Sequence, residues 1–234
     1  MVSTDQLLER GLAALCEGHP AVAQLLSNRG EALAGLLNTY RGEIELFNPA
    51  YSLVGAKDPQ ELVVKHLLDS LAPLGSMIRL LGAEDQESRG LPSIADVGSG
   101  AGLPGIPLAL CLPQFPVTLI ERSGRRVQFL SNTLAVLGLS QVTVEAQEME
   151  KAAPGRFALV TFRAFRPLEP ELLKGLFRLL KPGGVLAAYK GRKETINAEM
   201  GAIQHLTGGW EAIPTPVPFL EEERHLVVIR RRNE

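Results

Sequence analysis

The chain has 234 residues, 45% of them hydrophobic, and this is enough for one α/β domain with a substantial core, or for a domain with a helical extension. The formal net charge is −2. No apolar run approaches the roughly 20 residues that span a bilayer, and no secretion signal is visible, so we expect neither a membrane-spanning nor a secreted protein. Cys16 and Cys111 lie far apart without metal-ligand spacing, which predicts a cytoplasmic protein with no disulfide and no metal site.

The first 81 residues carry apolar stripes at helical spacing and predict a helical region that packs on the main domain without being an independent domain. Ser3 and Gln6 have the spacing of a capping box, which predicts the start of the first helix. Residues 31–47 predict a longer helix. We expect Asn48-Pro49 to end it, since the residue before a proline avoids helical backbone.

Asp58 predicts the start of another helix, with Pro59 in its first turn and Glu61 three positions after the cap. His66 and Asp69 lie three residues apart on one face of this helix. Two interpretations stay open for them: they reach a ligand crevice, or they form a polar cluster that fixes the helix on the main domain.

Residues 82–92 are rich in Gly, Ser and acids and predict a surface connection to a second region, residues 93–234. In this region predicted strands alternate with predicted helices, which implies an α/β fold with a largely parallel sheet. The last two strands follow each other without a helix and are expected to form a hairpin. The predicted strands are 93–97, 117–121, 142–146, 157–162, 184–190, 210–217 and 225–231, and the predicted helices are about 105–112, 124–138, 168–180 and 193–206.

An apolar run that carries Asp96 breaks into closely spaced glycines. This pattern predicts a buried strand, a tight loop and a helix whose free N–H groups can bind an anionic group. A side chain in place of Gly100 or Gly102 is expected to occupy ligand space. A second acid, Glu121, ends the next apolar run, where a carboxylate can accept both hydroxyls of a ribose. The glycines are Gly98, Gly100, Gly102 and Gly105.

The stretch DVGSGAGLPGIP at 96–107 resembles the cofactor loop of class I S-adenosylmethionine methyltransferases. Its LPGIP end is similar, more narrowly, to the bacterial 16S rRNA guanine-N7 methyltransferase family, also called glucose-inhibited division protein B. The resemblance covers the chain from about Phe47 to Ile229. It implies a Rossmann-like, seven-stranded, mostly parallel sheet, and transfer of a methyl group from S-adenosylmethionine to N7 of a guanine in 16S rRNA.

The resemblance also implies which residues hold the cofactor. The glycine loop would hold the methionine part, Glu121 the ribose, and the residues after the third strand the adenine. Gln147 departs from the family, which tends to have an arginine there. The implied cofactor residues are Asp96, Gly98, Ser99, Gly100, Gly102, Leu103, Glu121, Gln147, Glu148, Met149 and Arg163.

Arg163 and Lys190 are the candidate catalytic side chains, because each ends a predicted strand beside the crevice. The guanidinium of Arg163 can clamp a phosphate or stack on a base. The alternatives are a strand-end salt bridge for Arg163 and a solvated loop for Lys190. Phe162 stands where the family has a serine before this arginine. Residues 156–193 hold nine Lys and Arg against two acids and predict a surface that binds phosphates, unless they form only a solvated face.

Guanine N7 carries a lone pair and no proton, so methyl transfer to it depends on positioning and needs no general base. The expected substrate is 16S rRNA or a precursor of the small ribosomal subunit, with no membrane partner, and the protein is expected to be a monomer. Two other functions stay open. One is an NAD-dependent oxidoreductase with the dinucleotide spacing of Gly100, Gly102 and Gly105; the other is a non-catalytic module that binds a nucleotide or RNA.

Overall fold

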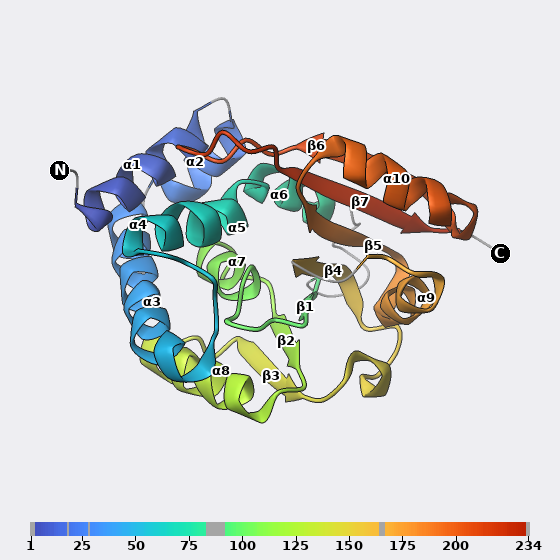
Figure 1. Ribbon diagram of the computed structural model, residues 1–234, viewed down its shortest axis with the longest axis horizontal. Helices are drawn as coiled ribbons and strands as arrows, with labels where there is room; N and C mark the ends of the chain where they lie inside the picture. Colours follow the sequence, from blue (N-terminus) through green and yellow to red (C-terminus); the bar gives the residue numbers. More distant parts are fainter. Residues whose placement is uncertain (1–2, 18, 28, 83–91, 164–166, 233–234) are drawn as a thin grey trace.

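The structure is a computed structural model, and it describes residues 3–17, 19–27, 29–82, 92–163 and 167–232. A seven-stranded sheet forms its centre, in the order β3-β2-β1-β4-β5-β7-β6 (Figure 1). Neighbouring strands are parallel except that β7 runs antiparallel to β5 and to β6. The α/β fold and the mostly parallel sheet expected from the sequence are confirmed. The strands are β1 Ile94–Val97, β2 Val117–Glu121, β3 Val142–Ala146, β4 Phe157–Arg163, β5 Leu180–Lys190, β6 Thr207–Pro214 and β7 His225–Arg231.

The strand boundaries differ from the prediction mainly at two strands: β5 begins at Leu180 and not at residue 184, and β6 is Thr207–Pro214 where 210–217 was predicted. Pro182 and the two glycines after it are typical of a loop. Leu180 nevertheless pairs with Phe157 of β4, and a bulge absorbs the irregularity between the two strands. The hairpin expected at the end of the chain is confirmed by the antiparallel pairing of β6 with β7.

Helices cover both faces of the sheet, and apolar residues of the central strands divide between two apolar clusters, one on each face. In β1, Ile94 belongs to the first cluster, whereas Ala95 and Val97 belong to the second. The first cluster also contains side chains of the N-terminal helices, α7 and α8, and the second contains those of α9 and α10. These four helices are α7 Gly105–Cys111, α8 Gly124–Leu137, α9 Pro170–Leu179 and α10 Lys193–Ile203.

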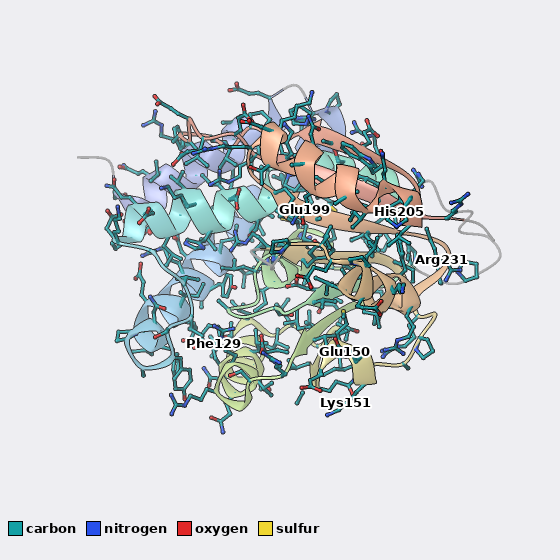
Figure 2. All side chains as sticks on the ribbon, turned by 45° about the vertical axis from the view of Figure 1, so that its right-hand side comes forward. Phe129, Glu150, Lys151, Glu199, His205 and Arg231 are labelled. Carbon is teal, nitrogen blue, oxygen red and sulfur yellow. The ribbon has the colours of Figure 1, made fainter. Side chains whose placement is uncertain are left out.

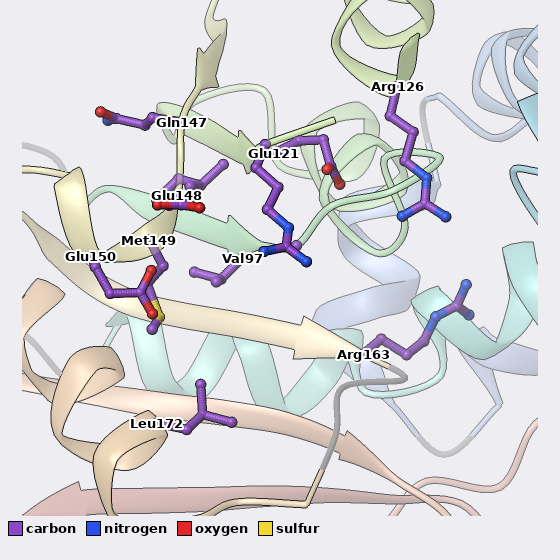
Figure 3. A pocket seen from close by; sticks show the side chains of 12 residues that line it. Val97, Glu121, Arg126, Gln147, Glu148, Met149, Glu150, Arg163 and Leu172 are labelled. Atoms are coloured by element: carbon purple, nitrogen blue, oxygen red, sulfur yellow. The ribbon is translucent and has the colours of Figure 1, made fainter. Parts of the chain in front are cut away.

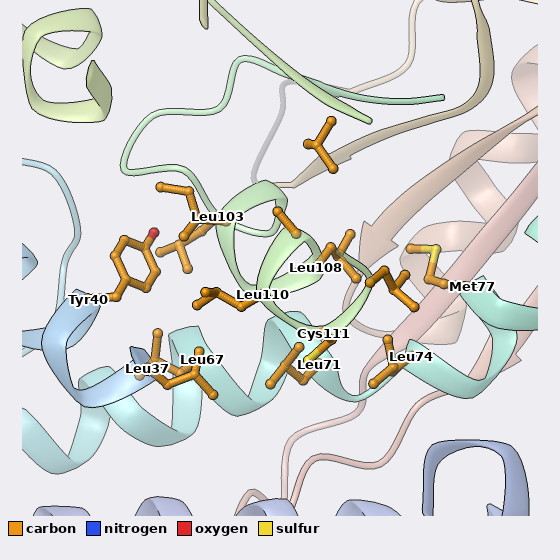
Figure 4. Packing of buried hydrophobic residues seen from close by; sticks show 14 of the residues in the cluster. Leu37, Tyr40, Leu67, Leu71, Leu74, Met77, Leu103, Leu108, Leu110 and Cys111 are labelled. Atoms are coloured by element: carbon orange, nitrogen blue, oxygen red, sulfur yellow. The ribbon is translucent and has the colours of Figure 1, made fainter. Parts of the chain in front are cut away.

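The N-terminal helices share a core with the sheet. Figure 4 shows side chains from α3, α5 and α7 in the first cluster, among them Leu37, Leu71 and Leu110.

The capping box at Ser3 and Gln6 is confirmed, while the division of the chain into two regions stays a prediction. None of the described helices is long and apolar enough to cross a membrane. The N-terminal helices are α1 Thr4–Cys16, α2 Pro20–Leu26, α3 Gly30–Tyr51, α4 Pro59–Leu62, the π-helical turn η1 Val63–Leu68, α5 Asp69–Leu71 and α6 Leu74–Gly82.

The helix end expected at Asn48-Pro49 is wrong, because α3 continues through Pro49 to Tyr51. A proline this close to the end of a helix removes only one of the last backbone donors. The Asn48 side chain closes the end of the helix, since its Oδ1 accepts the N–H groups of Leu53 at 2.8 Å and Val54 at 2.9 Å.

Candidate functional site

The loop after β1 holds three glycines in left-handed backbone conformation, namely Gly98 with φ 69°, Gly100 with φ 59° and Gly102 with φ 89°. A Cβ on Gly100 would meet no atom nearer than 3.8 Å, whereas a Cβ on Gly102 would lie 2.5 Å from Cδ1 of Ile106 and 3.0 Å from Leu130. There is open space beside Gly100, so the expectation that a side chain there would enter ligand space stays a prediction. It is wrong for Gly102, where a side chain would collide with packed residues of α7 and α8.

Asp96 lies in β1 behind this loop and is fully buried. Its Oδ2 accepts the N–H of Gly105 at the start of α7 at 2.9 Å, while Oδ1 has no hydrogen-bond partner in the described part of the chain. Burial raises the pKa of Asp96 to about 7, against the opposing effects of the Gly105 N–H and the positive charge of Arg163. Since buried polar atoms are normally paired, the free oxygen marks a place where a ligand donor would fit.

Glu121, the last residue of β2, joins the loops after β1 and β2. Its Oε2 accepts the N–H of Gly100 at 2.9 Å, and its Oε1 accepts the N–H of Ser123 at 2.8 Å. An ionised carboxylate offers about four lone-pair sites. Glu121 can therefore hold both loops and still accept hydrogen bonds from a ligand.

A cavity of about 530 Å³ opens at the carboxyl ends of β1, β2, β3 and β4 (Figure 3). Open α/β sheets bind their ligands at this edge. Arg122, Arg126 and Glu150 also line the cavity and were not predicted from the sequence. Arg122 directly follows β2, and this position is a signal that could have found it. Of the predicted cofactor residues, the lining includes Gly98, Glu121, Gln147, Glu148, Met149 and Arg163, whereas Asp96, Ser99, Gly100, Gly102 and Leu103 lie outside it.

The loop after β3 is held in place from two sides. Nε2 of Gln147 donates to Glu145 at 2.7 Å, so this side chain is anchored to its own strand. Arg178 of α9 donates to the carbonyl groups of Met149 at 3.0 Å and Glu150 at 2.9 Å. The wall of the cavity that these residues form is thereby fixed against α9.

Tyr40 of α3 reaches the glycine loop from the N-terminal helices. Its side chain is fully buried, and its O–H donates to the carbonyl of Ala101 at 2.6 Å. Burial raises the pKa of Tyr40 well above its usual value, so the phenol keeps the proton that it donates. Leu103, one of the predicted cofactor residues, is buried in the same apolar cluster as Tyr40 (Figure 4).

Arg163 ends β4, and its guanidinium lies against the helical segment that carries His66 and Asp69. It donates to Oδ2 of Asp69 at 3.0 Å and to the carbonyl of His66 at 3.3 Å. Arg224 donates to the other oxygen of Asp69 at 3.1 Å. Burial, together with the charge of Arg163, lowers the pKa of His66 to about 4, so this ring is neutral at physiological pH.

These contacts form the polar cluster that was one of the two interpretations for His66 and Asp69. Arg163 also lines the cavity, so the role predicted for it toward a ligand stays a prediction. Lys190 pairs with Glu199 of α10 at 2.8 Å, and the two side chains are only 16% and 11% exposed. Its predicted catalytic role likewise stays a prediction.

Comparisons with known proteins bear on the identity of this site. A family model described as rRNA small subunit methyltransferase G matches residues 33–227. A protein named ribosomal RNA small subunit methyltransferase G from Treponema denticola is 37% identical, with 98% of this chain and 100% of the relative covered. A protein of the same name from Xanthomonas axonopodis pv. citri is 38% identical, with 86% and 88% covered. The chain belongs to the rRNA small subunit methyltransferase G family.

Solved structures share the fold of this family member. A predicted O-methyltransferase from Agrobacterium tumefaciens has a TM-score of 0.54 at 21% identity, over 72% of this chain and 82% of that one. A SAM-dependent methyltransferase from Aquifex aeolicus has a TM-score of 0.52 at 17% identity, over 81% and 97%. At these identities the likeness shows the fold alone, and it confirms the Rossmann-like methyltransferase fold. Family membership confirms the resemblance seen in the sequence and favours the methyltransferase over the oxidoreductase and the non-catalytic module.

Proposed function

We propose that this chain transfers the methyl group of S-adenosylmethionine to N7 of a guanine in 16S rRNA, either as naked rRNA or in a precursor of the small ribosomal subunit. The observation that carries the proposal is the match of the family model to residues 33–227. That range includes every residue that lines the cavity of about 530 Å³ at the carboxyl ends of the parallel strands.

The residues around the cavity fit S-adenosylmethionine. The free Oδ1 of Asp96 suits the ammonium group of the methionine part, since an adjacent positive charge offsets the cost of ionising a buried carboxyl. Glu121 lies at the end of the second strand, where a carboxylate suits two ribose hydroxyls. The loop from Gln147 to Met149 lines the opposite part of the cavity and suits the adenine.

S-adenosylmethionine supplies a methyl group carried on a positively charged sulfur. Guanine N7 offers a lone pair and no proton, so no side chain has to remove one. The contribution of this chain is to bind and orient, and such positioning can lower a barrier by several kcal/mol. Methylated N7 carries positive charge, so the cation Arg163 suits an RNA phosphate or the cofactor carboxylate better than the reacting base.

The test is methylation of 16S rRNA from cells that lack the protein, both as naked rRNA and as small-subunit particles. We expect labelled methyl from S-adenosylmethionine to appear on one guanine as N7-methylguanine, mapped by chain cleavage at the modified base. Glu121→Gln should raise the KM for S-adenosylmethionine. Transfer to another atom, no transfer to either substrate, or tight NAD binding without S-adenosylmethionine binding in calorimetry would refute the proposal.

A further inference from the structure

We propose that a second site, a basic groove at the opposite end of the sheet, binds phosphates of the rRNA at a distance from the methylated base. The groove lies where β5 and β6 begin and β7 ends, and it encloses about 770 Å³. Among the described residues that line it there are four cations and no Asp or Glu. These cations are Lys181, Arg230, Arg231 and Arg232. The identity of the partner as rRNA rests on the proposed function.

The groove is separate from the cofactor crevice. The strand β5 leads from Leu180, which lines the groove, to Lys190 at the crevice end of the sheet. Ten steps along a strand, at about 3.3 Å each, separate the two places by roughly 30 Å. In Figure 2, Arg231 and His205 are labelled on the right-hand side of the molecule. A ligand that occupies both sites must therefore be extended, as a large folded RNA is.

The arginines of the groove are available to a ligand. All three are exposed. No carboxylate pairs with Arg230 or Arg231 in the described part of the chain, and Arg232 donates through Nη1 to the carbonyl of His205 at 3.2 Å. Successive side chains of a strand point to opposite faces, so Arg230 and Arg231 lie on either side of the end of β7. Guanidinium groups match the oxygens of a phosphate with paired N–H donors.

The remaining lining favours a nucleic-acid backbone over a protein partner. Gly183 is exposed and places no side chain beside the arginines, and a Cβ there would meet no atom within 4 Å, so a nucleic-acid backbone can approach closely at this point. The lining contains no aromatic side chain among the described residues, whereas protein interfaces usually depend on aromatic anchors in fitted pockets. A surface of cations with neither an acid nor an aromatic anchor among the described lining residues suits a polyanion.

The experiment compares Arg231→Gln/Arg232→Gln with a control, Arg10→Gln/Lys57→Gln. Each variant removes two positive charges. Arg10 and Lys57 are exposed and line neither the crevice nor the groove. Binding to naked 16S rRNA is measured over a range of salt concentrations without any turnover, and the melting temperature of each variant checks the fold.

We expect the groove variant to bind 16S rRNA roughly 2- to 30-fold more weakly than the control, as loss of two exposed ion pairs implies. The log–log salt dependence should be less steep by about 1.4 to 1.8. An oligonucleotide too short to reach the groove should bind both variants equally. Equal affinity and equal salt dependence on 16S rRNA would overturn the proposal. A difference that appears only with small-subunit particles would overturn it in favour of a protein partner. Because no methyl transfer is measured, these outcomes are distinct from a failure of the proposed function.

Discussion

Replacing Tyr40 by phenylalanine tests whether α3 positions the glycine loop for the cofactor. The change keeps the fully buried ring and removes only the O–H that donates to the carbonyl of Ala101 at 2.6 Å. A buried carbonyl left without its donor costs about 1–3 kcal/mol. The free energy of unfolding, measured in urea, should fall by about this amount.

The same loss should reach the cofactor site through the loop. Ala101 follows Gly100, whose N–H is held by Glu121 at 2.9 Å. The freed carbonyl gains a water partner only if the loop moves outward, and that movement pulls Gly100 away from Glu121. Binding of S-adenosylmethionine must then restore the loop. Up to about 1–3 kcal/mol of affinity is lost, which corresponds to roughly 5- to 150-fold in the calorimetric Kd.

Tyr189→Phe is the matched control. Tyr189 is also buried, and its O–H donates to the carbonyl of Ser70 at 2.7 Å, on α5 and away from the glycine loop. It should lose comparable stability and keep the affinity of the wild type for S-adenosylmethionine. Equal affinities for the Tyr40 and Tyr189 variants would show that Tyr40 supports the fold alone, and the reasoning about the loop would be refuted.

Three further changes test the residues around the loop. Asp69→Asn removes the carboxylate shared by two guanidinium groups and should lower the free energy of unfolding in urea by about 3–5 kcal/mol. The control Glu171→Gln breaks an exposed ion pair and should change this free energy by less than about 1 kcal/mol. Similar effects of the two changes would contradict the prediction. Gly105→Ala should lower the free energy of unfolding by about 1–3 kcal/mol and lower the melting temperature, since the new Cβ would lie 2.8 Å from Oδ2 of Asp96. The control Gly124→Ala places its Cβ in open space and should leave the melting temperature unchanged. Burial raises the pKa of Asp96 from 3.8 to about 7, so the native state keeps a proton that the unfolded chain has released, and stability should fall by up to about 4 kcal/mol as the pH rises from about 4 to 7. In Asp96→Asn, the free energy of unfolding measured in urea should no longer fall over this pH range. If it falls as it does in the wild type, groups other than Asp96 cause the pH dependence.

The sheet could be predicted from the sequence because its strands are short apolar runs bounded by glycines, prolines and charges. The run from Val117 to Glu121 is one strand in both the prediction and the structure. The end of α3 could not be predicted, because it depends on two hydrogen bonds that the Asn48 side chain accepts from residues beyond the helix. The local rule for the residue before a proline takes no account of a side chain that closes the end of the helix.

Part of the lining of the cavity could be predicted from the sequence for a related reason. Gly98 directly follows β1 and Glu121 is the last residue of β2, and a parallel sheet brings such strand ends together at one edge. The partners of Arg163 depend on tertiary structure, since Asp69 lies 94 positions away and comes from a helix outside the alternating pattern. Because the two residues are so far apart in sequence, the sequence could not show whether Arg163 and Asp69 face a ligand or pair with each other.

Charge composition alone does not show which cations can bind RNA, because an ion pair within the fold competes for a cation; the phosphate-binding surface predicted at residues 156–193 stays a prediction. Residues 156–193 hold nine cations, yet Arg156 pairs with Glu145, which lies outside the segment, and Lys190 pairs with Glu199. Arg230 and Arg231 end the strand β7 and Arg232 follows it, and the fold places no acid beside these arginines in the described residues. When the fold places an acid from elsewhere in the chain beside a cation, the two form an ion pair, and that cation is less available to RNA. The amino-acid composition is the same in either case. Which cations can bind RNA phosphates therefore depends on which of them are paired with acids, and the fold determines this pairing.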